Sequence, residues 1–136
     1  MPESKLIFVD QQSGLMWTRD GNIAGKVMTW HQAMEWAKNL NYGEYNDWRL
    51  PTIEELWSFI EKPRELLRGT PEECCHYTWF NANGFKNVQA EWYWSGTEDN
   101  TIKNNIIVGA EMVDTRGPCD GNSYKDDDGF VWPVRG

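Results

Sequence analysis

Cysteine and histidine supply the most reactive side chains in this sequence, and they are few: three cysteines and two histidines among 136 residues. Cys74, Cys75 and His76 are consecutive, so they could share a metal ion if further ligands lay near. The sequence offers no second cluster at metal-ligand spacing, and we expect no zinc-type site here. A reactive thiol also needs a base beside it, and His31 and His76 are the two histidines that could serve.

A third cysteine, Cys119, raises the question of a disulfide. Cys74 and Cys75 are adjacent and would be strained as a pair, yet either could bridge to Cys119 and leave one odd thiol. Three free cysteines are the alternative. The cysteine count does not decide between a disulfide and three free thiols.

Carboxylates crowd the last third of the chain and could bind a hard cation such as calcium. The densest run is Asp126, Asp127 and Asp128, with Asp114 and Asp120 upstream. Because this run lacks the alternating spacing of an EF-hand loop, a solvated acidic turn is the competing interpretation. We expect no cofactor, and a calcium ion at the Asp126, Asp127 and Asp128 run is the alternative hypothesis.

Aromatic side chains are the best candidates for ligand contacts. Tyr77, Trp79, Phe80 and Phe85 lie in a polar segment that offers few ways to bury them. Their ring faces could stack on sugar rings or on apolar side chains of a partner. We therefore predict ligand contacts at these four residues. The next polar segment adds two carboxylates to the predicted ligand site, Glu98 and Asp99.

Overall charge narrows the range of partners. The formal net charge is -8 and the isoelectric point is near 4.7. Nucleic acids and anionic membranes require clustered Lys and Arg, so neither is expected as a partner, and a sulfated polysaccharide is disfavoured for the same reason. No apolar run approaches the roughly 18 residues of a membrane helix, and the start of the chain lacks the regions of a signal peptide. We expect no membrane insertion, while the compartment and the oligomeric state stay open.

Two helices are predicted ahead of the aromatic candidates, over residues 30–40 and 53–61. Each begins with a capping box, formed by Thr29 with Gln32 and by Thr52 with Glu55. Apolar residues then recur at helical spacing in both segments. Pro63 ends the second helix.

Short strands are predicted toward both ends of the chain. They cover residues 6–10 and 14–19 before the helices, and residues 92–95, 105–113 and 130–135 after them. Long loops are predicted over residues 64–91 and 114–129. The length, 1–136, suits a single domain. Because the helices are segregated from the strands, we predict an α+β fold with an antiparallel sheet, in which the last strand returns beside the first.

A strap, residues 48–52, joins the two predicted helices. Pro51 disfavours a helical conformation at the residue before it, which directs an extended approach to the second helix. We predict that Arg49 pairs with a carboxylate or a carbonyl group of the protein itself.

Tryptophan is expected to supply much of the core volume, because the chain has 9 Trp while its hydrophobic content is 40%. Trp48, Trp94 and Trp132 should be buried, since together in water they would expose a large apolar area. A core built from a few large side chains tolerates long irregular loops.

Motifs at five places in the sequence resemble a single domain family. They are Ser-Gly-Leu-Met-Trp at 13–17, Thr-Trp-His-Gln-Ala at 29–33, Asp-Trp-Arg-Leu-Pro-Thr at 47–52, Tyr-Trp-Ser-Gly-Thr at 93–97 and Val-Arg at 134–135. In this order they resemble the family named after the C-terminal domain of the Legionella collagen-like adhesin, long catalogued as a domain of unknown function. The resemblance covers nearly the whole chain, and the motifs are specific in combination.

That family resembles the C-type lectin-like fold. The resemblance implies two helices packed on a small curved antiparallel sheet, adjacent termini and a long loop region that carries the ligand site. Many relatives are exported surface or adhesin modules, which implies a secreted or cell-surface location. Some relatives have a disulfide from the first helix to the last strand. Ala37 and Pro133 occupy the places where those cysteines would be expected, which weakens the inference of export.

Calcium-dependent sugar binding of the usual lectin type is not expected. Lectins of that type use Glu-Pro-Asn or Gln-Pro-Asp in the long loop and Trp-Asn-Asp on a later strand to coordinate the ion. None of these motifs occurs in this sequence.

Three hypotheses about function follow. We expect a non-catalytic recognition or adhesion module whose long loops bind a glycan or a surface protein. The alternative is an enzyme, because the formylglycine-generating oxidases share this broad fold and use cysteines; here Cys74, Cys75 and Cys119 are the available thiols. A structural component of a surface or phage assembly is a third alternative.

Overall fold

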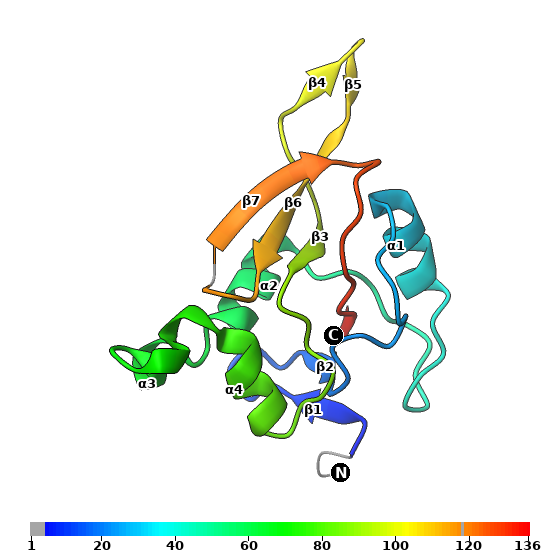
Figure 1. The fold of residues 1–136 in the computed structure, drawn as a ribbon. Coiled ribbons are helices and arrows are strands. Elements are labelled where there is room, and N and C mark those ends of the chain that lie inside the picture. Colours follow the sequence, from blue (N-terminus) through cyan, green and yellow to red (C-terminus); the bar gives the residue numbers. More distant parts are fainter. Residues whose placement is uncertain (1–4, 118) are drawn as a thin grey trace.

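The computed structural model describes residues 5–117 and 119–136, and these form an α+β arrangement with small antiparallel sheets (Figure 1). This confirms the fold class predicted from the segregation of helices and strands. None of the helices in the described residues has the length and apolarity needed to cross a bilayer.

The first sheet joins the two ends of the described chain. Its strands are β1 (Ile7–Val9), β2 (Met16–Thr18) and β8 (Val134–Arg135), in the order β1-β2-β8. Trp17 of β2 lies opposite Phe8 on one side and Val134 on the other. The last strand was expected beside the first, and this detail is wrong: β8 pairs with β2. The other edge of β8 bonds to the strap, because the backbones of Arg49 and Val134 exchange two hydrogen bonds of 2.9 Å.

The second sheet is built from the later part of the chain. Its strands are β3 (Trp92–Glu98), β6 (Gly109–Asp114) and β7 (Cys119–Tyr124), in the order β3-β6-β7. A separate two-stranded hairpin, β4 (Ile102–Lys103) with β5 (Ile106–Ile107), interrupts the connection from β3 to β6. Figure 1 shows this hairpin standing beyond the sheet, on the side away from β1 and β2.

Two predicted boundaries in this region are wrong. The predicted loop 114–129 contains β7, whose polar and mostly exposed residues give no apolar alternation; the ladder to β6 holds it in place. The predicted strand 105–113 is two strands, β5 and β6, because the chain leaves the hairpin before it joins the sheet.

Both predicted capping boxes are present at the starts of α1 (Trp30–Lys38) and α2 (Ile53–Ile60). At α2, the Glu55 backbone N–H donates to Thr52 Oγ1 at 3.2 Å, and the Thr52 N–H donates to Glu55 Oε1 at 2.9 Å. These reciprocal bonds satisfy amide groups that the first helical turn leaves unpaired. The sequence therefore predicted both helices and their first residues.

The segment predicted as a long loop, residues 64–91, is largely helical. It holds α3 (Arg64–Leu67), a turn of 3-10 helix, η1 (Pro71–Cys74), and α4 (His76–Ala82). No side chain caps α3 or α4, and both are short, so the usual start signals are missing from the sequence. Three of the four aromatic residues predicted to contact a ligand therefore lie on α4 and not in a loop.

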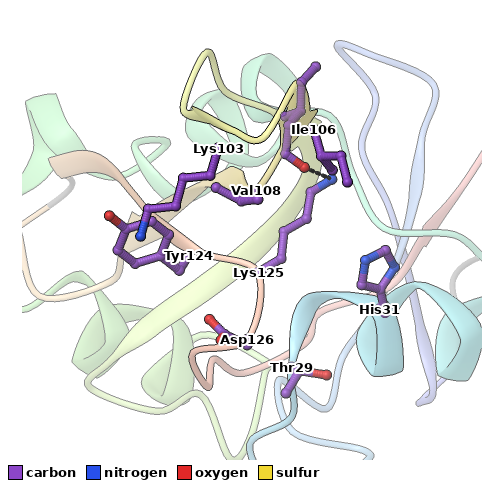
Figure 2. A pocket seen from close by; sticks show the side chains of 9 residues that line it. Thr29, His31, Lys103, Ile106, Val108, Tyr124, Lys125 and Asp126 are labelled. Atoms are coloured by element: carbon purple, nitrogen blue, oxygen red, sulfur yellow. Dashed lines mark hydrogen bonds between the residues drawn. The ribbon is translucent and has the colours of Figure 1, made fainter.

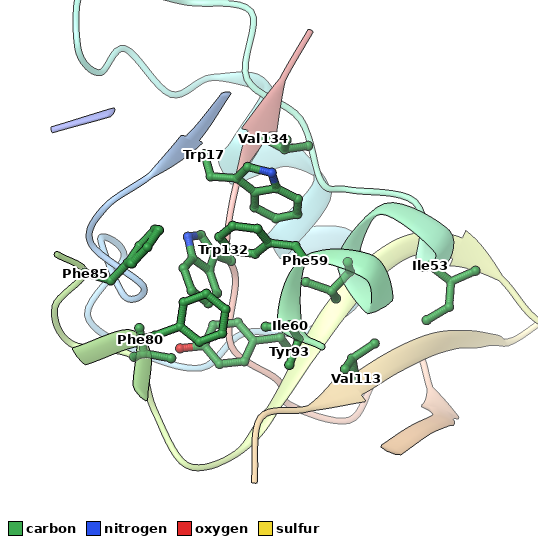
Figure 3. Packing of buried hydrophobic residues seen from close by; sticks show 12 residues of the cluster. Trp17, Ile53, Phe59, Ile60, Phe80, Phe85, Tyr93, Val113, Trp132 and Val134 are labelled. Carbon is green, nitrogen blue, oxygen red and sulfur yellow. The ribbon is translucent and has the colours of Figure 1, made fainter. Parts of the chain in front are cut away.

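Two clusters of buried apolar residues form the core, one around Trp17, Phe59 and Trp132 and the other around Trp30 and Trp94. In the first cluster the rings of Trp17 and Phe59 stack with centroids 3.9 Å apart, and Trp132 meets Phe59 edge-on at 5.0 Å (Figure 3). Stacked and edge-on pairs are the favourable aromatic geometries.

All three tryptophans predicted to be buried, Trp48, Trp94 and Trp132, are buried. Their indole N–H groups donate to backbone carbonyl groups of Tyr42, Met28 and Thr18. Each polar edge is therefore satisfied inside the protein, which removes the main cost of burying a tryptophan.

The strap connects the second helix to the end of the chain. Arg49 donates to both carboxylate oxygens of Glu55, at 2.8 and 3.0 Å, and to the carbonyl oxygen of Gly136 at 3.2 Å. This confirms that Arg49 pairs within the protein. Glu55 thus serves the capping box and the ion pair together, and its hydrogen bonds to Arg49 lower its pKa below the ordinary value.

Candidate ligand-binding surface

The hairpin β4–β5 is closed by a two-residue turn. Asn104 and Asn105 both have positive φ, 53° and 64°, and the flanking pairs are Ile102 with Ile107 and Lys103 with Ile106. Two-residue hairpin turns of the favoured twist require positive φ at both positions, and Asn tolerates it better than most residues. The turn therefore fixes which side chains share a face of the hairpin.

Aliphatic side chains on this hairpin are unusually exposed. The exposed fractions are 60% for Ile102, 63% for Ile106 and 39% for Ile107, and Tyr124 at the end of β7 is 43% exposed. Isolated exposed apolar residues are ordinary, but a group of them on one projecting element marks an interaction site. We call Ile102, Lys103, Ile106, Ile107 and Tyr124 the hairpin surface.

A hollow of about 470 Å³ lies between the hairpin and the start of α1 (Figure 2). The hairpin, the end of β7 and the first turn of α1 all contribute to its walls. Its lining residues are Thr29, His31, Lys103, Ile106, Ile107, Val108, Tyr124, Lys125 and Asp126. The volume falls within the usual range for small-ligand sites, and the wall is mostly apolar.

Lys125 holds the hairpin against the body of the protein. Its ammonium group pairs with Glu98, donates to the carbonyl oxygen of Ile107 at 3.1 Å, and lies 4.3 Å from the centroid of the Trp30 ring. The side chain is 12% exposed. A lysine so enclosed is stabilised by these three contacts together, and through them it links β3, β5 and α1.

Lys103 is the other cation at the hollow. Its ammonium group lies 4.5 Å from the centroid of the Tyr124 ring, and no carboxylate among the described residues forms an ion pair with it. Asp126 lines the same hollow and is exposed. The hollow therefore offers one cation and one anion to a ligand, while Lys125 is already paired.

The structure buries two of the four aromatic residues of the predicted ligand site, while contacts at Tyr77 and Trp79 stay a prediction. Phe80 is 0% and Phe85 6% exposed, and both belong to the core cluster around Trp132. Tyr77 and Trp79 are partly buried and pack against the same cluster. α4 turns Phe80 inward, and Phe85, which follows the helix, packs against Phe80 and Trp132, so neither ring is available to a ligand.

The two predicted ligand carboxylates have separate roles. Glu98 pairs with Lys125 at the base of the hairpin surface. Asp99 accepts the Thr101 backbone N–H at 2.7 Å and lies so close to Gly109 that a side chain at that position would collide with its carboxylate. Both carboxylates thus shape the connection that carries the hairpin.

The predicted metal residues lie in an exposed turn after β7. Asp127 accepts hydrogen bonds from the Ser123 hydroxyl at 2.7 Å and from the Tyr124 N–H at 3.2 Å, while Asp126 and Asp128 are exposed. Asp127 and Asp99 line one small polar hollow. Within residues 5–117 and 119–136, no three metal-ligating side chains gather. A calcium ion at Asp126, Asp127 and Asp128 stays a prediction.

The cysteines are three free thiols, so the alternative of a disulfide to Cys119 is not the one adopted. A hydrogen bond between the Cys75 and Cys74 thiols, together with desolvation, raises the pKa of the Cys75 thiol, which disfavours the reactive thiolate. His76 is buried with Nδ1 2.9 Å from the Ile60 carbonyl oxygen, and burial lowers its pKa. These shifts favour the neutral thiol at Cys75 and the neutral imidazole at His76.

The sequence predicted ligand contacts at Glu98 and Asp99, in the polar segment that leads into the hairpin, but it did not predict the hairpin itself. The signal was present: Asn104 and Asn105 form a turn dipeptide flanked by isoleucines. It was assigned to the start of a strand because the apolar run from Ile106 onward continues past the hairpin into β6.

The fold and this surface define a small α+β domain whose candidate site lies on an exposed hairpin beside a hollow. The chain matches the family model described as the Lcl C-terminal domain over residues 7–135, and it belongs to that family. This confirms the resemblance found in the sequence motifs. No curated protein matches the chain.

Proposed function

We propose that this chain is a non-catalytic recognition or adhesion module that binds a glycan or a protein at the hairpin surface. The observation that carries the proposal is the exposure of Ile102, Ile106 and Ile107 on a projecting hairpin beside a hollow. Burying a large aliphatic side chain is worth about 1.5 to 3 kcal/mol, so a partner that covers this group gains substantial free energy.

The rigid attachment of the hairpin supports the same proposal. Lys125 ties the hairpin to β3 and α1 through three contacts, which limits the conformational entropy lost when a ligand binds. A mobile hairpin would lose more of the binding energy to ordering.

The family and the fold agree with an adhesive role. We infer a C-type lectin-like fold from the two capped helices, the terminal sheet that joins both ends of the described chain, and the long excursion between β3 and β6. The family takes its name from a domain of an adhesin, which supports display at a bacterial surface.

A binding screen against a glycan array and a panel of surface proteins, run with calcium and with chelator, tests the proposal. Wild type is compared with Ile106→Asp and with Leu66→Asp, because Leu66 is 68% exposed on α3, far from the hairpin (Figure 1). We expect a ligand that binds the wild type and the Leu66→Asp variant but does not bind the Ile106→Asp variant. A ligand bound equally by all three would refute the assignment of the site.

A further inference from the structure

The aromatic rings at the hollow are poorly placed for stacking on a sugar. Trp30 is buried, with the ammonium group of Lys125 over its ring at 4.3 Å. One face of Tyr124 carries the ammonium group of Lys103 at 4.5 Å. Sugar rings stack on bare aromatic faces, and a cation already covers one face of each of these two rings. The hairpin surface therefore presents mainly aliphatic side chains to a partner.

Branched aliphatic side chains suit a protein partner. Ile102 and Ile107 lie directly opposite each other across the hairpin and share one face. Ile106 shares the other face with Lys103. Rounded, rigid side chains pack closely against other aliphatic groups but offer no hydrogen bonds to hydroxyl groups. They match the apolar centre of a protein interface.

The positive charge of Lys103, opposite Ile106 on the hairpin, favours a partner with an acidic group. Lys103 has no carboxylate partner among the described residues, whereas Lys125 is paired with Glu98. The chain as a whole carries a formal net charge of -8, which repels a polyanion. A single carboxylate beside an aliphatic residue would pair with Lys103 and would be repelled by the acidic chain less than a polyanion would be.

Resting on the proposed function, we infer that the hairpin surface binds a segment of a partner protein in which aliphatic side chains adjoin one carboxylate. The aliphatic residues of the segment cover Ile106 on the face that it shares with Lys103, and they enter the hollow that Ile107 also lines. The carboxylate pairs with Lys103 at its edge.

Selection from a displayed library of random peptides tests this inference on the full chain. We expect enriched peptides that combine aliphatic residues with a neighbouring Asp or Glu, and that lose affinity roughly tenfold or more for Ile106→Asp but not for Leu66→Asp. Repeating the selection on Lys103→Glu should enrich Lys or Arg in place of the acid. Circular dichroism and thermal melting of each variant establish that the fold is intact.

Three results would overturn the inference. Enriched peptides that show no preference for Asp or Glu, or a preference that Lys103→Glu leaves unchanged, would exclude an ion pair between the peptide and Lys103. A glycan that binds the wild type but not the Ile106→Asp variant would support the hairpin surface as the binding site and would refute a protein as the partner. If neither peptides nor glycans distinguish wild type from Ile106→Asp, the proposed function fails together with this inference.

Discussion

At the scale of residues, Glu55 carries two roles that are usually separate. It closes the capping box of α2 through Thr52 and pairs with Arg49 of the strap through both oxygens. Its side chain is 24% exposed and that of Arg49 39%, so solvent screens part of the attraction. The shared carboxylate makes the start of the helix and the position of the strap depend on one group.

Glu55→Gln should therefore lower the free energy of unfolding by roughly 1 kcal/mol at neutral pH. Because the hydrogen bond to Arg49 lowers the pKa of Glu55 in the folded state, its contribution is present above the ordinary value of 4.5 and is lost as the pH falls through the folded pKa. Urea unfolding of both proteins between about pH 7 and pH 3 measures this, and the difference should shrink toward acid.

Glu65→Gln is the matched control, since Glu65 pairs with Arg68 where both side chains are largely exposed. That change should alter stability little at any pH. Equal losses for the two variants would show that the strap contributes nothing beyond a surface ion pair.

Phe80 provides a second test at this scale, because its predicted contact with ligand and its observed burial lead to opposite results. Phe80 is 0% exposed and packs against Phe59 and Trp132. Phe80→Ala should cost about 3 to 5 kcal/mol in the free energy of unfolding. Trp79→Ala, at a partly buried neighbour, should cost less. A stable Phe80→Ala protein would mean that α4 does not bury this ring.

At the scale of elements, the hairpin depends on Lys125 for its position. Lys125→Met keeps a long apolar stem over Trp30 but removes the ion pair with Glu98 and the bond to the Ile107 carbonyl oxygen. We expect amide hydrogen exchange in residues 102–108 to accelerate roughly tenfold, with little change in the core strands.

Lys103→Met is the control for this prediction, since Lys103 lies on the same hairpin and contacts the Tyr124 ring. Exchange in residues 102–108 should stay close to that of wild type. If Lys125→Met leaves exchange in the hairpin unchanged, the backbone turn and the bonds at the hairpin base are sufficient to hold it.

The elements that the sequence predicted are those with local signals. Both capped helices and the strap can be recognised from the residues at 29–32 and 48–55, because capping boxes and proline act over a few positions. α4 and β7 could not be predicted in this way. α4 has no cap, and β7 has a polar sequence that pairs because β6 lies beside it. The burial of Phe80 could not be predicted either, because it depends on α4.

At the scale of the whole molecule, the acidic character of the chain does not imply a metal. Asp127 already accepts two hydrogen bonds, and Asp99 accepts one in the same hollow. We expect the melting temperature in about 5 mM calcium to equal that in chelator. A clear rise with calcium, lost in Asp127→Asn, would instead support an ion at this hollow.

The placement of β8 has a consequence for how this molecule is made. Val134 and Arg135 complete a sheet whose other strands lie within the first 18 residues, and Val134 also bonds to the strap. Contacts between residues so distant along the chain must wait until the intervening segments have been synthesised. During translation, β1 and β2 therefore emerge long before their partner, with an unpaired edge and with Trp17 exposed. Nascent chains of this domain should need protection from aggregation until the last residues of β8 leave the ribosome.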